Sequence, residues 1–204
     1  MAKLYMLERR RHKWGDYYDI LMHGMSWHLG RKGNLIQLER TGPFMPPVSL
    51  PGVGDIVVTD AFRRELEASG LAGLHFQPVI KKLIVHLDWH TWDREADGPP
   101  EIPVPDGEPE DYVLGQPHSA AIARQIGQLW ELSLNASAMV RRIKRTGAED
   151  DIYLLTDSWQ GEDLFRAQGV LYNYATERAK DWLEQHVGEY VTFQEARTEA
   201  DARH

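Results

Sequence analysis

The stretch "DIVVTDAFRRELEASGLAGLHFQPV", residues 55–79, has the pattern of one strand–helix–strand unit. The β-branched run at 55–58 favours a short strand. Thr59 can then cap a helix through its hydroxyl group, and Asp60 is favourable in the first helical turn. Gly70 is a natural helix end, after which extended chain resumes. A strand, a capped helix and a second strand in this order predict an α+β fold.

The same pattern returns near the end of the chain. Residues 176–196, "TERAKDWLEQHVGEYVTFQEA", align without gaps on residues 59–79. The identical pairs are Thr59/Thr176, Leu66/Leu183, Glu67/Glu184, Phe76/Phe193 and Gln77/Gln194. We interpret the match as two related strand–helix–strand units in a mixed or antiparallel sheet with a few packing helices. Two copies are too few for a solenoid.

Residues 93–111, "DREADGPPEIPVPDGEPED", interrupt this pattern with eight acids, five prolines and two glycines against one arginine. Proline lacks the amide that helices and central strands need, so the segment is predicted to be an exposed loop. We expect one α+β domain over 1–204, or two lobes of about 1–92 and 112–197 joined by this loop. Residues 198–204 are expected to form a flexible tail.

Two further segments carry local signals. "TGPFMPPVSLPGVGD" (41–55) is rich in proline and glycine, which predicts a loop. Residues 119–133 place apolar side chains at helical spacing after Ser119, a favourable N-cap. That spacing predicts a helix continuing through Leu129 and Trp130.

Composition narrows the class of protein. The chain is 42% hydrophobic with 7 Trp and 8 Tyr, which is typical of a globular protein with a core. It has no cysteine, which excludes disulfides and thiolate metal sites. Neither a signal-peptide pattern nor an apolar run of roughly 18 residues is present. We therefore expect a cytoplasmic protein that does not contact a membrane.

The charge distribution bears on the kind of partner. The net charge is −8, and residues 51–204 carry 27 acidic against 15 basic side chains. Nucleic-acid binding needs a basic surface, so the balance argues against that class. An acidic body instead favours a basic protein partner and speeds encounter with it.

The stretch "HLDWHTWD" (86–93) raises the question of a metal site. If the strand before it continues, His86, Asp88 and His90 share one face at intervals of about 7 Å. Such a set can bind zinc or iron, which would make the protein a metal-dependent hydrolase. The HExxH motif is absent and no second histidine pair occurs. The competing interpretation is a strand with a solvated polar face, so we predict no catalytic, cofactor or metal site and keep the hydrolase as the alternative.

The acidic loop has two interpretations, a solvated linker or an anionic surface presented to a partner. Its prolines would lower the entropy lost on binding, and its carboxylates can pair with Arg or Lys. Two flanking tryptophans could serve as aromatic anchors. The predicted partner-binding residues are Trp89, Trp92, Asp93, Glu95, Asp97, Glu101, Asp106, Glu108, Glu110 and Asp111.

Three segments together resemble a bacterial immunity-protein family of polymorphic toxin systems. They are "VVTDAFRRELEASGLAGLHFQPV" (57–79), "HLDWHTWD…PPEIPVPDGEPEDY" (86–112) and "DLFRAQGVLYNYATERAKDWLEQHVGEYVTFQEA" (163–196). The resemblance covers most of residues 50–197. A related myxobacterial group carries two CxxCG motifs, whereas this chain has no cysteine. The resemblance implies a non-enzymatic cytoplasmic protein that binds and neutralises a cognate toxin, and it transfers no contact residue. A third interpretation is a scaffold that forms homo-oligomers.

Overall fold

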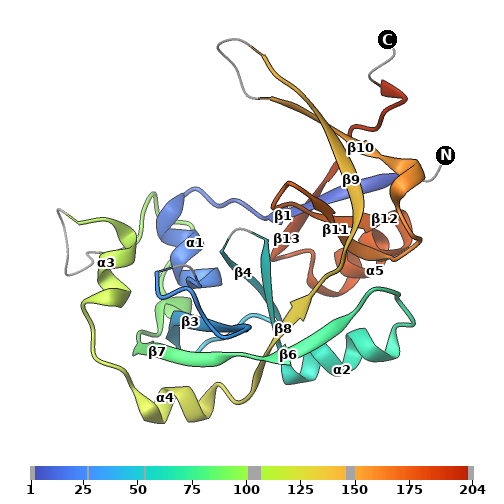
Figure 1. The fold of residues 1–204 in the computed structure, drawn as a ribbon. Helices are drawn as coiled ribbons and strands as arrows, with labels where there is room; N and C mark the ends of the chain where they lie inside the picture. Colours follow the sequence, from blue (N-terminus) through green and yellow to red (C-terminus); the bar gives the residue numbers. More distant parts are fainter. Residues whose placement is uncertain (1–2, 27, 53, 101–106, 146–149, 202–204) are drawn as a thin grey trace. The chain divides into compact units, whose positions relative to one another are not determined.

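The computed structural model describes residues 3–26, 28–52, 54–100, 107–145 and 150–201 (Figure 1). These residues form five helices and thirteen strands, which confirms the predicted α+β class. The elements are β1 (Leu4–Arg9), α1 (Asp16–His23), β2 (Arg31–Lys32), β3 (Leu35–Gly42), β4 (Val48–Gly52), β5 (Asp55–Thr59), α2 (Asp60–Ala68), β6 (His75–Pro78), β7 (Ile80–His86), α3 (Pro109–Leu114), α4 (Ala120–Gln125), β8 (Leu129–Ser133), β9 (Ala136–Ile143), β10 (Asp151–Leu155), β11 (Leu164–Gln168), β12 (Asn173–Thr176), α5 (Glu177–Val187) and β13 (Val191–Glu195).

The chain divides into two compact units, and each is assembled from distant segments. Unit 1 comprises Met1–Glu8, Leu66–His75 and Ser133–His204, and unit 2 comprises Arg9–Glu65 and Phe76–Leu132. The lobes expected at about 1–92 and 112–197 divide the chain at other positions, and the acidic segment 93–111 lies inside unit 2. The units do not follow chain order, because β1 from the N-terminus lies in the sheet of unit 1.

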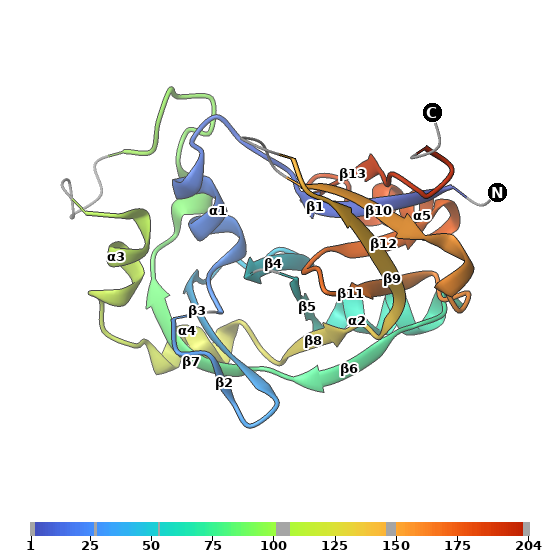
Figure 2. The same ribbon diagram turned by 45° about the horizontal axis from the view of Figure 1, so that its top comes forward.

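Three sheets organise the two units. Unit 1 holds a six-stranded sheet of order β10-β9-β11-β12-β1-β13, and α5 packs against β12 and β13. Unit 2 is built on a sheet of order β2-β3-β7 and a sheet of order β4-β5-β8-β6. The strands β3 and β7 pair in parallel, and α3 and α4 pack against β7. Figure 2 shows α1 and α3 side by side, in agreement with their contacts.

The predicted repeat is present and extends further upstream than the sequence match. Each copy is a hairpin, a helix and a strand: β4-β5-α2-β6 in one and β11-β12-α5-β13 in the other. In both sheets one strand from elsewhere in the chain is inserted before the last strand, giving β4-β5-β8-β6 and β11-β12-β1-β13. The two segments therefore follow one folding pattern at the level of sheet order as well as local structure.

Both copies begin their helix with the same cap. The hydroxyl oxygen of Thr59 accepts the amide of Phe62 at 3.2 Å, and that of Thr176 accepts the amide of Ala179 at 3.2 Å. Each hydroxyl satisfies an amide that has no partner within the helix. The caps predicted from sequence are confirmed at both positions.

Each inserted strand also meets its helix through a cation and an aromatic ring. The guanidinium of Arg63 lies 4.7 Å from the ring centroid of Trp130 on β8. The ammonium of Lys180 lies 5.3 Å from the ring of Tyr5 on β1. Arg63 and Lys180 occupy aligned positions of the two copies. Both distances are within the range of cation–π attraction, so the repeat conserves a tertiary contact that local pattern does not reveal.

The composition of segment 41–55 predicts a loop, but part of the segment forms a strand. Residues Val48–Gly52 form β4, in which Val48 pairs with Val58 of β5. The strand lies at the edge of its sheet. An edge strand tolerates Pro51 because its missing amide need not join a ladder.

The helix predicted over 119–133 is too long. Ser119 is the N-cap, with its hydroxyl oxygen accepting the amide of Ile122 at 3.3 Å, but α4 ends at Gln125. Gly127 then adopts a φ of +76°, a left-handed conformation suited to glycine, and the chain enters β8. No helix among the described residues is long and apolar enough to cross a membrane.

Candidate functional site

The polar stretch 86–93 leaves its sheet earlier than the sequence pattern predicts. β7 ends at His86, and Trp89–Thr91 forms a turn of 3₁₀-helix. Side chains alternate across a sheet only while the backbone remains extended. The prediction that a strand places His86, Asp88 and His90 on one face is therefore wrong.

The same three side chains do not form a metal site. All three are exposed, and the ring of His90 stacks on Phe44 with centroids 3.9 Å apart. Within the part of the chain that the structure describes, no three His, Cys, Asp or Glu residues are grouped to hold a metal ion. His86, Asp88 and His90 are therefore not grouped as the ligands of one metal ion in the described structure.

The two tryptophans of this stretch differ in exposure. Trp89 is 0% exposed, with its ring edge-on to those of Tyr18 and Phe44 at centroid distances of 6.0 and 5.6 Å. Trp92 is half-buried and packs on the core that contains Val85. The prediction of Trp89 as a surface anchor is wrong, because a fully buried ring cannot contact a partner. Trp92 retains some accessible surface.

The loop that follows is held to unit 2 through its main chain. The indole nitrogen of Trp14 donates to the carbonyl of Ala96 at 3.0 Å, and the ammonium of Lys13 donates to the carbonyl of Glu95. The carboxylate of Asp93 accepts the amide of Glu95 at 2.9 Å, which tightens the turn. The basic and aromatic groups thus fix backbone carbonyls and leave the carboxylates of the loop facing solvent.

The exposed acids of this loop form no ion pair with a described residue, although the ammonium of Lys13 binds the carbonyl of Glu95 beside them. Asp93, Glu95 and Asp97 are exposed. No Lys, Arg or His nitrogen lies within 4 Å of their carboxylates in the described structure. Carboxylates that take part in no internal ion pair remain available to a partner.

The end of the acidic segment is helical. Pro109 begins α3, and Glu108 and Asp111 form a reciprocal capping box in which the amide of Glu108 donates to Asp111 at 3.1 Å. The expected loop therefore ends at residue 108. Glu101 and Asp106 lie outside the described residues.

Two acids that the sequence prediction did not include lie next to α3. Asp16 and Asp19 on α1 line a crevice of about 90 Å³ together with Glu110 and Arg9. Burial raises the pKa of Asp19, while Arg9, 3.5 Å away, opposes the shift. The two acids are visible in the sequence, but they lie in residues 1–50, which carry 8 Lys and Arg against 4 Asp and Glu, so charge alone does not mark this part of the chain as acidic.

These groups define one candidate site, which we call the acidic surface. Each member carries a carboxylate and lies on α1, on the loop after Trp92 or at the start of α3. They are Asp16, Asp19, Asp93, Glu95, Asp97, Glu108, Glu110 and Asp111. Chemically, such a surface can bind arginine and lysine side chains of another protein.

Unit 2 also buries two basic side chains that are not part of the acidic surface, Arg40 and His23. Arg40 is 0% exposed, and among the described residues its guanidinium donates only to the carbonyls of Thr41 and Phe44, at 2.9 and 3.1 Å. Burial lowers the pKa of Arg40 to about 9. Burial also lowers the pKa of His23 to about 3, helped by the charges of Arg9 and Arg40. The amide of Leu50 donates to Nδ1 of His23 at 3.3 Å, so the ring is held neutral.

We expect His23 to make stability fall as the pH is lowered from about 6.5 toward 3. In the unfolded chain the pKa of His23 is about 6.5, whereas in the folded chain it is about 3. Between these two pH values the unfolded state binds a proton that the folded state does not bind, which favours unfolding. The loss amounts to a few kcal/mol, since each pKa unit is worth roughly 1.4 kcal/mol. Urea unfolding between pH 7 and 4 measures it. His23→Asn, which retains an acceptor for the amide of Leu50, should flatten the profile, whereas exposed His186→Asn should not. An unchanged slope in His23→Asn would contradict the assignment.

Comparison with protein-family models finds no match to this chain, and no curated protein matches it.

Proposed function

We propose that this chain is an immunity protein that binds a cognate bacterial toxin, secreted or delivered by contact, and neutralises it in the cytoplasm. The observation that carries the proposal is the acidic surface, in which Asp93, Glu95 and Asp97 are exposed, form no ion pair with a described residue, and lie on a backbone held by Lys13 and Trp14. A pre-organised loop loses less conformational entropy on binding than a free one. The family resemblance implies the same function.

The partner that this surface fits is a protein with a basic face. Toxins that attack nucleic acids need basic clefts to bind phosphates, and an anionic loop could occupy such a cleft. Charge complementarity of this kind raises the association rate and makes it depend on salt. Neutralisation by occupancy requires no catalytic residue on this chain.

The experiment that tests the function starts from the native host. The tagged full-length chain is purified after cross-linking, and each captured protein is expressed alone and then with the chain. We expect one captured protein to arrest growth by itself and co-expression to restore growth. Titration with purified proteins should then show full inhibition at one equivalent of chain to toxin.

Two results would contradict the proposal. One is the absence of any captured protein whose toxicity the chain suppresses. The other is complete inactivation of the toxin by far less than one equivalent, because that would indicate an enzyme acting on the toxin and not a stoichiometric inhibitor.

A further inference from the structure

The chain beyond β13 is hydrogen-bonded to β10, the strand at the other edge of the sheet of unit 1. The amide of Leu154 donates to the carbonyl of Arg197 at 2.8 Å, and the amide of Glu199 donates to the carbonyl of Leu154 at 3.2 Å. These two bonds make an isolated parallel bridge. The prediction of a flexible tail over 198–204 is therefore wrong for its first residues, and residues 202–204 lie outside the described structure.

Upstream of this bridge, two strand edges carry main-chain groups that are not paired. Such groups alternate in direction along a strand, so Ile152, two residues before Leu154, also turns its amide and carbonyl away from β9. The amide of Ala196 donates to the carbonyl of Leu4 on β1 at 2.8 Å, so Glu195 turns its main-chain groups away from β1. In the described structure, these outward groups of Ile152 and Glu195 have no hydrogen-bond partner.

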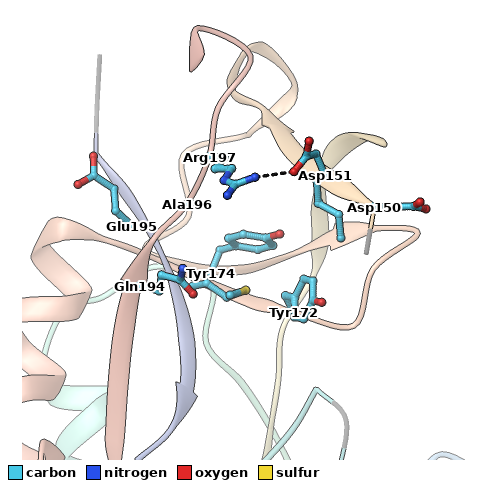
Figure 3. Close-up of a pocket in the computed structure, with 10 residues that line it drawn as sticks. Asp150, Asp151, Tyr172, Tyr174, Gln194, Glu195, Ala196 and Arg197 are labelled. Carbon is cyan, nitrogen blue, oxygen red and sulfur yellow. Dashed lines mark hydrogen bonds and ion pairs between the residues drawn. The ribbon is translucent and has the colours of Figure 1, made fainter. Parts of the chain in front are cut away.

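A cavity of about 380 Å³ separates the two edges (Figure 3). Ile152 lines it from β10, and Glu195 and Ala196 line it from the facing segment. Met6 and Tyr174, which belong to or pack on the core of unit 1, line it as well. The volume falls within the range of ligand sites, about 300–1,000 Å³. The parallel ladder that starts at the bridge is thus interrupted by a space that a ligand can enter.

The cavity offers an aromatic surface and an unpaired hydroxyl group. Tyr174 is only 3% exposed, and its ring stacks on Phe165 with centroids 5.6 Å apart. Its hydroxyl makes no hydrogen bond to another described residue. Burial raises the pKa of Tyr174 to about 12, so this hydroxyl stays protonated and can donate. Tyr172 also lines the cavity and is 41% exposed.

The charges around the cavity favour a basic ligand over an acidic one. The lining has three carboxylates and one arginine, which are Asp150, Asp151, Glu195 and Arg197. The carboxylate of Asp151 pairs with Arg197 and with Arg145, each at 2.6 Å. Asp150 and Glu195 form no ion pair with a described residue, and Figure 3 shows both directed away from the centre of the cavity. They are therefore free to pair with a cation at its mouth.

We propose that an extended segment of another protein adds as a strand between β10 and residues 194–197. An extended chain carries amides and carbonyls on both sides, so it can pair with Ile152 on one side and Glu195 on the other. In strand addition these main-chain bonds supply affinity, and alternate side chains supply specificity. Here the apolar side chains of the segment pack on Tyr174, and a Lys or Arg among the others pairs with Asp150 or Glu195. The site lies in unit 1 and does not depend on the proposed immunity function.

Fluorescence anisotropy of the full-length chain with a labelled hexapeptide of alternating valine and lysine tests the proposal. We expect saturable binding with one site per chain. Hydrogen-exchange mass spectrometry should show slower amide exchange in residues 150–153 when this peptide is bound, because the amide of Ile152 gains an acceptor. The same peptide with N-methyl groups on alternate residues lacks the donors of one side and should bind several-fold more weakly. A hexapeptide of alternating valine and glutamate should also bind more weakly.

Two double variants with equal changes of charge locate the binding. Asp150→Asn/Glu195→Gln should weaken binding of the valine–lysine peptide several-fold, because it removes both unpaired carboxylates. Glu95→Gln/Asp97→Asn, on the acidic surface, should leave binding unchanged. Equal effects of the two double variants would indicate general attraction to an acidic protein and would overturn the proposal.

Four other results would also overturn it. These are the absence of saturable binding, equal binding of the N-methylated or the glutamate peptide, unchanged exchange in residues 150–153, and protection of those residues by self-association without peptide. The last result would identify a second copy of the chain as the occupant. The N-methylated peptide is tested on the native chain, so its result does not depend on whether a variant folds.

Discussion

The double variant Glu95→Lys/Asp97→Lys is expected to associate with the toxin about tenfold to a thousandfold more slowly than the native chain at low salt. Both carboxylates are exposed and lack a basic partner within 4 Å in the described structure, so reversing them changes the field at the surface without breaking an internal ion pair. Stopped-flow or surface-based kinetics across a salt series measures the effect. The difference should narrow as salt rises, because added ions screen exposed charges.

The matched control carries the same change of charge at two other exposed acids. Glu65→Lys/Asp157→Lys alters the net charge equally but lies outside the acidic surface. A local role predicts that this control keeps most of its association rate, whereas a purely global effect predicts equal loss in both. Full protection and native kinetics in Glu95→Lys/Asp97→Lys would show that toxin does not bind at this loop.

The second large effect is on stability, and it comes from Trp89→Ala. We expect a loss of about 3–5 kcal/mol, the usual range when a fully buried large aromatic side chain is truncated. Trp89 is 0% exposed and meets Tyr18 and Phe44 edge-on, so its removal leaves a cavity and breaks both ring contacts. Urea unfolding followed by circular dichroism measures the change.

Two conservative comparisons make the stability result specific. Trp89→Phe should cost much less than Trp89→Ala, because it keeps an aromatic ring and removes a buried indole nitrogen that has no hydrogen-bond partner among the described residues. Trp92→Ala, at a half-buried neighbour, should also cost less. If Trp89→Ala were as stable as the native protein, the side chain could not be part of the core.

The starts of three helices follow from the sequence because the hydrogen bond that decides each of them is close in sequence. The helices after Thr59 and Thr176 begin where the caps predicted, because a cap hydrogen bond spans three residues. The helix predicted after Ser119 begins at the correct residue but extends too far. The spacing of its apolar residues does not distinguish a helix from a strand that buries the same leucines. Gly127 and the pairing of β8 with β5 decided that point.

The candidate site was only partly predictable. The acids of 93–111 are visible in the composition, and the structure leaves Asp93, Glu95 and Asp97 exposed. Asp16 and Asp19 were not anticipated, because they join Glu110 only through the packing of α1 on α3. Trp89 is predicted to face a partner but is buried, because the backbone changes from strand to 3₁₀ turn at this point and alters which side chains face inward.

By itself, the sequence determined the α+β class, the two strand–helix–strand units and the acidic, cysteine-free character of the chain. These properties depend on hydrophobic periodicity, capping and charge, which act over a few residues or over composition. Only the tertiary structure decided which strands complete each sheet and which residues surround the cavity of unit 1. Those features join residues up to about two hundred positions apart, such as Met6 and Arg197, and no local pattern specifies which distant segments pair.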